Sequence, residues 1–297
     1  MRLCEFRPSG AGPGARRLGI VEGGEVYAAR GFETMTDYIL SGAWPKLPEG
    51  GGAALGLASV SLLAPVPRPG KIVAAIVNTQ AMLGGDIRLD RPRLDMKAPS
   101  AVVGPGDMIA SQGLGIRPEV ELAAVVGRRI TKASPEAAKS CLMGFMILND
   151  VTAPSDSRED AYEAYRRDRS SGEIRRSTMR GPLFRSKNHD TFCPTGPWMV
   201  TSDELGDTSG LRMSTKFDGM LVQTGSTSEY IFAPERIASY VSGFLSLDPG
   251  DIVSCGSVGW APEALGSLDP TEFVLPRRAG TLELEIERIG TLTNPVA

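Results

Sequence analysis

The chain has 297 residues, of which 41% are hydrophobic and 23% are charged, values that are ordinary for a globular protein with a sizeable core. Lys and Arg total 32 against 35 Asp and Glu, and the formal charge of −3 is too mild to attract nucleic acid or an anionic membrane by its net field. The 35 glycines and 22 prolines indicate many turns and short strands and argue against an all-helical fold. We therefore expect a β-rich protein whose partners are small molecules.

The cysteines and the N-terminus bear on the cellular compartment. The four cysteines lie far apart and form no C-x-x-C pair, so the sequence predicts neither a zinc knuckle nor a redox motif. The N-terminal segment has no apolar signal core, and no run of about 18 apolar residues is present to span a bilayer. We expect a cytoplasmic protein with reduced thiols that neither spans nor binds a membrane.

The first part of the chain differs from the rest. Residues 1–65 contain short apolar stretches separated by glycines, together with a predicted helix near Met35–Leu40. The proline-dense stretch 63–70 disfavours regular structure, and the apolar run 71–77 after it indicates a buried strand. These patterns predict a small N-terminal β-rich domain over 1–65 and a larger domain over 66–297.

The larger domain alternates strands with short helices. Apolar runs predict strands at 120–127, 141–148, 197–201 and 252–254. Ser134 is a candidate N-cap of a short helix, because Pro135 and an acidic residue follow it. A second, amphipathic helix is predicted to begin at Pro234.

One segment stands out by its charge. Residues 158–185 carry eight arginines against five acidic residues, with few apolar positions. We expect an exposed helix-and-loop insertion at about 156–186. Its arginines are interpreted first as a solvated charged face, and the alternative is a lid in which Arg158 reaches back to clamp a substrate carboxylate.

Three acidic residues form a candidate metal site. Residues two apart in a strand face the same side, so Glu119 and Glu121 project together, and Asp150 ends the next apolar strand, where a charge is costly unless it is neutralised. Oxygen-only ligation suits magnesium or manganese better than zinc, with calcium as a third candidate. The alternative is that E-x-E marks the solvent-exposed face of an edge strand, and the spacing alone is equally consistent with it.

Seven segments of the larger domain together resemble the fumarylacetoacetate hydrolase (FAH) family. They are KIVAAIVN at 71–78, KAPSAVVGPGD at 97–107, EVELAAVVGR at 119–128, NDV at 149–151, KNHDTFCPTGPW at 187–198, SLDPGDIV at 246–253 and ERIGTLTNPV at 287–296. The resemblance covers most of residues 70–297 and implies a β-rich α+β fold, a mixed β-sandwich roll of the FAH type, in a homodimer. It also implies a magnesium or manganese site, because Glu119, Glu121 and Asp150 match the family's ligands.

Further site residues follow from the same resemblance. Lys187 matches the family's active-site lysine, whose ammonium would stabilise an oxyanion, and Thr191 is expected at the rim of the site. His189, the sole histidine, is a candidate proton carrier beside Lys187, the alternative being a packing or surface role. The family's T-G-T-P substrate loop appears as Cys255-Gly256-Ser257-Val258, so Gly256 and Ser257 are expected to bind substrate.

The sequence also departs from the family where water is activated. Met82 replaces the usual histidine and Gly85 the usual glutamate, so the dyad is degenerate and Asp86 is a displaced substitute. Pro154 replaces the arginine of the family's S-A-R-D segment, and proline cannot supply that charge.

These observations leave three hypotheses for a small 2-oxo or 1,3-dicarbonyl acid. The first is a metal-dependent hydrolase that cleaves a C–C bond of an acylpyruvate-like substrate, with His189 or Asp86 as a relocated base. The second is a lyase or isomerase, such as a decarboxylase, dehydratase or keto–enol isomerase, which the missing dyad favours because no activated water is needed. The third is a binding protein without turnover, against which the intact acids and Lys187 argue.

Overall fold

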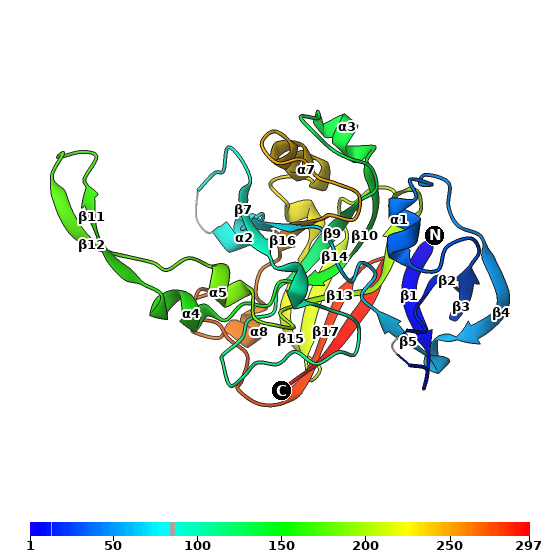
Figure 1. The fold of residues 1–297 in the computed structure, drawn as a ribbon. Coiled ribbons are helices and arrows are strands. Elements are labelled where there is room, and N and C mark those ends of the chain that lie inside the picture. Colours follow the sequence, from blue (N-terminus) through cyan, green and yellow to red (C-terminus); the bar gives the residue numbers. More distant parts are fainter. Residues whose placement is uncertain (13, 84–86) are drawn as a thin grey trace.

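The fold is centred on one large mixed β-sheet (Figure 1). The computed structural model describes residues 1–12, 14–83 and 87–297. Along the sheet the strands follow the order β4 (Gly50–Gly56), β3 (Glu25–Ala29), β2 (Arg17–Glu22), β1 (Arg2–Pro8), β13 (Cys193–Thr201), β10 (Leu142–Asn149), β9 (Val120–Val126), β16 (Ile252–Ser257), β6 (Ile72–Ile76) and β7 (Arg93–Lys97). β5 (Val60–Leu63) also pairs with β1, and β8 (Val102–Val103) with β13. The strands predicted around 71–77, 120–127, 141–148, 197–201 and 252–254 are confirmed.

The N-terminal strands continue the main sheet, because Arg2 and Leu3 of β1 pair with Val200 and Met199 of β13. The predicted helix α1 (Met35–Leu40) is confirmed, and a 3-10 turn, η1 (Leu57–Ser59), precedes β5. Cys4, Phe6, Val21, Val26 and Val60 form a small cluster of their own, whereas other buried residues of this segment, such as Leu3 and Met35, belong to the cluster that contains Ala123 and Leu148. We keep the division into domains at residue 65 as a proposal.

The central strands β9 and β10 are buried along their whole length. Both sides of these strands are covered, so their sequences are continuously apolar and do not alternate. Leu122 and Ile147 belong to one large core cluster, whereas Ala123 and Leu148 belong to a second cluster on the opposite side. A charge at the end of either strand therefore lies at the edge of the most shielded part of the molecule.

A second sheet packs against the first. Its antiparallel strands follow the order β15 (Met220–Ser226), β14 (Arg212–Phe217), β17 (Gly280–Ile286) and β18 (Gly290–Val296). In β17, Leu282 and Leu284 are buried whereas Glu283 faces solvent, and the buried side joins the core cluster that contains Leu122 and Ile147. Two packed sheets with short helices confirm the predicted β-rich, mixed sandwich architecture.

Short helices fill the connections between strands. They are α2 (Gln80–Leu83), η2 (Pro99–Ala101), α3 (Pro135–Lys139), α6 (Ser202–Leu205), η3 (Thr227–Glu229), α7 (Pro234–Ser242) and α8 (Pro262–Leu265). Ser134 caps α3 by accepting a hydrogen bond from the backbone N–H of Ala137, as predicted, and α7 begins at the predicted Pro234. Among the described residues no helix is both long enough and apolar enough to cross a membrane.

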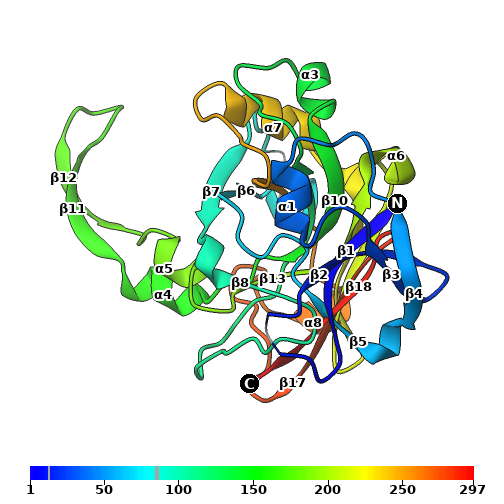
Figure 2. The same ribbon diagram turned by 45° about the vertical axis from the view of Figure 1, so that its right-hand side comes forward.

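The prediction of a helix-and-loop insertion was wrong at its centre. Helix α4 (Pro154–Glu159) and helix α5 (Phe184–Lys187) flank a β-hairpin of β11 (Tyr162–Arg167) and β12 (Ile174–Met179). Both views show this hairpin extending away from the body of the protein (Figures 1 and 2). Because neither face is buried, its sequence lacks the apolar alternation that identifies a strand.

The turn of the hairpin has a local cause. The carboxylate of Asp168 accepts hydrogen bonds from the Ser170 hydroxyl and from the backbone N–H groups of Ser170 and Ser171, which lower the pKa of Asp168 to about 2. Gly172 then adopts a positive φ of 73°. Asp168, the two serines and the glycine were the sequence signals for a turn.

Candidate active site

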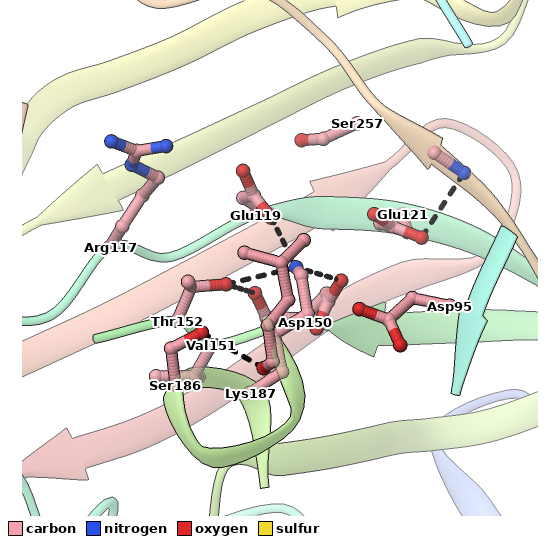
Figure 3. Close-up of polar contacts among 12 residues, drawn as sticks. Asp95, Arg117, Glu119, Glu121, Asp150, Val151, Thr152, Ser186, Lys187 and Ser257 are labelled. Carbon is pink, nitrogen blue, oxygen red and sulfur yellow. Dashed lines mark hydrogen bonds and ion pairs between the residues drawn. The ribbon is translucent and has the colours of Figure 1, made fainter. Parts of the chain in front are cut away.

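The three predicted carboxylates converge at one end of the central strands (Figure 3). Glu119 immediately precedes β9, Glu121 is its second residue, and Asp150 directly follows β10. The two strands are antiparallel neighbours, and the Asp150 N–H donates to the Glu119 carbonyl at 2.9 Å. One oxygen of each carboxylate lies within 4.8 Å of the others, and all three residues are buried. The structure therefore brings together the residues that the sequence proposed as metal ligands.

Strand β16 holds the carboxylate of Glu121. The Ser254 hydroxyl donates to Glu121 Oε2 at 2.6 Å, and the Gly256 N–H donates to the same oxygen at 3.1 Å. The ladder between β16 and β9 shifts register here, which turns the Gly256 N–H toward Glu121. Gly256 has a φ of 89°, and a Cβ there would lie 2.7 Å from Asn78 Cβ, so only glycine fits. Gly256 thus supports Glu121, and its predicted role in substrate binding stays a prediction.

Lys187 joins two of the carboxylates. Its Nζ lies 2.6 Å from Asp150 Oδ2 and 3.2 Å from Glu119 Oε2, and it donates to the Thr152 hydroxyl at 3.0 Å. Burial alone would lower the pKa of Lys187, but the charges of Asp150 and Glu119 outweigh it and raise the pKa above its ordinary value. Lys187 is thus a fixed cation in the site, where the sequence placed it.

A second lysine at the site was missed from the sequence. Lys97 is the last residue of β7, its side chain is fully buried, and its Nζ lies 3.0 Å from both Asp150 Oδ1 and the Val151 carbonyl. It also donates to the Lys187 carbonyl. The available signal was a lysine that opens the matched segment 97–107. Lys97 therefore ties both Asp150 and the Lys187 backbone to β7.

The electrostatic balance of the site favours a cation. Burial and the nearby charge of Asp150 raise the pKa of Glu121 to about 8. Burial acts in the same direction on Asp150, but Lys187 and Lys97 together lower the pKa of that carboxyl. With all three carboxyls ionised, as metal ligation requires, three carboxylates against two ammonium groups leave one negative charge. Asp150 Oδ1, although near Lys97, accepts no hydrogen bond from the described residues. A hard divalent ion fits this set of oxygen donors.

The carboxylates open into a cavity of about 200 Å³. Lys187, Ser257 and Met82 line it, and so do two residues with no predicted role here, Arg117 and Trp260. Ser257 Oγ accepts a hydrogen bond from Gln223 Nε2 at 2.9 Å, so the Ser257 hydroxyl proton is available to another acceptor. The structure thus places Ser257 where a substrate-binding residue belongs.

Other predicted residues lie elsewhere. The imidazole of His189 contacts Asp156 Oδ2 at 2.6 Å and packs on the ring of Phe192, and His189 does not line the cavity. The hydroxyl of Thr191 accepts a hydrogen bond from the Ala110 N–H, again away from the cavity wall. Both residues hold loops together in the structure, which gives no support to their predicted roles in catalysis and substrate binding.

The positions of the degenerate dyad are described in part. Met82, which the resemblance puts in place of a histidine, lies in α2 and lines the cavity. Gly85 and Asp86 lie outside the described residues. Among the described residues that line the cavity there is no histidine, and Glu119, Glu121 and Asp150 are its only carboxylates.

The arginines of the insertion separate into two groups. Arg158, the predicted lid residue, pairs with Glu272 and does not line the cavity. Arg180, which follows β12, does line it, and its Nε donates to the Ser157 hydroxyl at 3.0 Å. Pro154, at the position of the family's arginine, begins α4 and also borders the cavity. The insertion therefore reaches the cavity through Ser157, Arg180, Leu183 and Ser186, of which Arg180 carries a charge.

Comparison with known proteins identifies the family. The sequence profile described as "Fumarylacetoacetate (FAA) hydrolase C-terminal" matches residues 74–297. The chain belongs to the fumarylacetoacetate hydrolase family. It is 32% identical over 273 residues to a 2,4-didehydro-3-deoxy-L-rhamnonate hydrolase of Sphingomonas sp. (strain SKA58), with 87% of each chain covered. It is 30% identical over 321 residues to the mitochondrial oxaloacetate tautomerase FAHD2B of Bos taurus, covering 100% of this chain and 91% of that protein.

A solved structure in the family adds a metal and a ligand. The maleylpyruvate hydrolase from Sphingobium sp. SYK-6, in complex with manganese (II) ion and pyruvate, superposes with a TM-score of 0.69. The two chains are 25% identical, and the match covers 100% of this chain and 99% of that one. The relatives of this FAH-family protein are therefore enzymes named for hydrolysis or tautomerisation of small acids.

Proposed function

We propose that this FAH-family chain is a metal-dependent enzyme that acts on a small 2-oxo or 1,3-dicarbonyl acid. Mg²⁺ or Mn²⁺ would be held by Glu119, Glu121 and Asp150, with Ca²⁺ as a weaker candidate. The observation that carries the proposal is the convergence of these three buried carboxylates beside the Lys187 ammonium, at the inner end of a small cavity. The manganese and pyruvate in the maleylpyruvate hydrolase structure support it.

The chemistry combines a Lewis acid with fixed charges. A bound divalent ion would polarise the carboxylate and ketone oxygens of a 2-oxo acid. Lys187 stays protonated at neutral pH because its pKa is raised, so it would stabilise developing negative charge and not act as a base. Ser257 has a hydroxyl proton to donate into the cavity, because Gln223 already occupies its acceptor position.

Among the reactions of the family, we propose keto–enol tautomerisation or isomerisation first. Such a reaction moves a proton between carbon and oxygen and needs no activated water. The described wall of the cavity has a methionine, Met82, where hydrolases of this pattern place a histidine, and His189 lies outside it. The full-length match to an oxaloacetate tautomerase supports this order.

Hydrolytic C–C cleavage of an acylpyruvate-like acid is the second candidate, although the sequence favoured it first. The relative named as a rhamnonate hydrolase supports it. It requires a group that activates water, and Asp86, outside the described residues, is the candidate that the sequence offers for this role.

One experiment separates the two reactions. The protein is incubated with Mg²⁺ or Mn²⁺ and a panel of oxaloacetate, acylpyruvates and 2-keto-3-deoxy acids, in water labelled with ¹⁸O and deuterium. Tautomerisation speeds deuterium incorporation at carbon and leaves the carbon chain intact, whereas hydrolysis places ¹⁸O in a product acid. Glu121→Gln should abolish either activity, and Glu283→Gln, on the solvent face of β17, is the matched control. The proposal fails if no substrate reacts and Glu121→Gln does not change Mn²⁺ binding.

The proposal extends to the oligomeric state and the cellular location of the protein. We propose a homodimer, from the family resemblance, and keep the cytoplasmic location as a prediction. The bovine relative is named as mitochondrial. Light scattering after gel filtration measures the oligomeric state, and a mass of about 31.5 kDa would overturn the dimer.

A further inference from the structure

Two arginines line the cavity without a carboxylate partner among the described residues. Arg117 precedes Glu119 by two residues, and its guanidinium is held by the Phe273 carbonyl at 3.2 Å and the Thr271 carbonyl at 2.6 Å. It also lies 5.6 Å from the ring centroid of Trp260. In Figure 3 Arg117 lies across Glu119 from Lys187. Backbone carbonyls and an aromatic ring orient this guanidinium, but they do not neutralise its charge.

Arg180 is the second of these arginines. It comes from the base of the hairpin, directly after β12, and Ser157 of α4 orients its Nε. Four other arginines of the insertion are paired with acids. These pairs are Arg158 with Glu272, Arg175 with Glu173, Arg176 with Glu163, and Arg185 with Asp156, Glu159 and Asp160. Arg117 and Arg180 both line the cavity, and among the described residues their hydrogen-bond partners are the Phe273 and Thr271 carbonyls and the Ser157 hydroxyl, with no ion pair to an acid.

The net charge of the cavity lining indicates what kind of ligand it would bind. With its three carboxylates ionised, as in a metal-loaded site, the inner end of the cavity and its two buried ammonium groups carry a net charge of −1, which a divalent ion would change to +1. Arg117 and Arg180 add two charges, because guanidinium does not deprotonate in proteins. The loaded cavity would then hold a net charge of +3. A substrate with two carboxylates matches this field better than a monoacid does.

We propose that Arg117 and Arg180 bind a second carboxylate of the substrate, so that the natural substrate is a short 2-oxo dicarboxylic acid. The 2-oxo acid end would face the three carboxylates and Lys187, and the distal carboxylate would face the two guanidinium groups, which are suited to bidentate binding. The cavity of about 200 Å³ is smaller than the ~300–1,000 Å³ typical of pockets for drug-sized ligands, which favours a short chain. This inference rests on the proposed function.

The test compares two probes that differ only in the distal group. The Mn²⁺-loaded protein is titrated by calorimetry with 2-oxoglutarate and with 2-oxopentanoate, which has a methyl group in place of the second carboxylate. We expect 2-oxoglutarate to bind at least about 10-fold more tightly, the effect of hydrogen bonds to a charged group. Arg117→Gln and Arg180→Gln should each reduce this preference about 10-fold and leave the Kd values of 2-oxopentanoate and Mn²⁺ unchanged.

Control variants test whether the preference for 2-oxoglutarate depends specifically on Arg117 and Arg180. Arg158→Gln removes an arginine of the same insertion that pairs with Glu272 outside the cavity, and it should leave the preference intact. Arg117→Lys keeps the charge but loses the planar fork, so it should retain part of the preference if the protein folds normally. Equal binding of the two probes by the wild type, or an undiminished preference in both Gln variants, would overturn the inference. Failure of the wild type to bind Mn²⁺ would instead overturn the proposed function and this inference with it.

Discussion

The inner and outer ends of the cavity are built on different principles. At the inner end, Glu121, Asp150, Lys97 and Lys187 are buried, both lysines pair with Asp150, and the two acids stand on or next to the central strands. At the outer end, Arg180 comes from the base of an exposed hairpin and contacts a single serine hydroxyl. The inner end is fixed by the core of the fold, whereas the outer end can vary with the insertion. Substitutions at the inner end should therefore lower the free energy of unfolding and the Mn²⁺ affinity more than substitutions at the outer end.

The largest effect is expected for Asp150→Asn. The substitution keeps the size of the side chain but leaves Lys97 and Lys187 without their shared carboxylate. Breaking a buried ion pair costs about 3–5 kcal/mol in the free energy of unfolding, and Mn²⁺ affinity should fall more than about 100-fold. Urea denaturation and calorimetric Mn²⁺ titration measure the two effects. A variant as stable as the wild type would contradict the role of this triad.

Lys97→Met should have the next largest effect on stability. It removes the buried ammonium that contacts Asp150, the Val151 carbonyl and the Lys187 carbonyl. Because Asp150 keeps its pair with Lys187, we expect a loss of about 2–3 kcal/mol, the cost of stranding buried acceptors. Lys139→Met, in the last turn of α3 and outside the cavity, is a control. Similar denaturation midpoints for the two variants would count against Lys97 as a structural anchor of the site.

The raised pKa of Glu121 predicts how the stability of the metal-free protein changes with pH. Its pKa is raised to about 8 in the folded protein, so folding favours its protonated form. That contribution is complete below about pH 4.5 and is lost as the pH rises through 8. The metal-free protein should therefore lose roughly 2–4 kcal/mol of unfolding free energy between pH 5 and pH 9. Glu121→Gln, which is neutral at every pH, should lack this decline, and saturating Mn²⁺ should remove it from the wild type.

The smallest effect is expected at the hairpin. Tyr162 and Met179 are cross-strand partners, so an Asn-Gly turn can join them in place of 163–178. An isolated two-stranded hairpin contributes little stability, and the change in unfolding free energy should stay below about 1 kcal/mol, with Mn²⁺ affinity unchanged. A loss of several kcal/mol by urea denaturation would show that the hairpin packs on something in solution.

The same contrast explains what the sequence could predict. The buried strands, the helix starts at Ser134 and Pro234, and the grouping of Glu119 with Glu121 follow from local sequence patterns. Asp150 follows from the strand before it. The family and the role of Lys187 were predicted from the resemblance to the FAH family. Local rules reach these features because each depends on neighbours in the sequence.

The rest depends on contacts between distant segments. Lys97 is 53 residues from Asp150 and Arg117 is 63 residues from Arg180, so no local pattern shows that they meet at one cavity. His189 was placed beside Lys187 by sequence proximity, yet its ring pairs with Asp156 of α4. The hairpin was missed because an exposed ribbon has no buried face to impose a period on its sequence.

The placement of the ligands on β9 and at the end of β10 also has a kinetic consequence. Both strands are paired on both sides within the main sheet and buried throughout, so no loop movement alone can separate Glu121 from Asp150. Local opening of such strands requires nearly the full free energy of unfolding. An ion bound there would therefore add its binding energy to the stability of the whole fold. Hydrogen exchange of the β9 amides should slow in proportion to the free metal concentration.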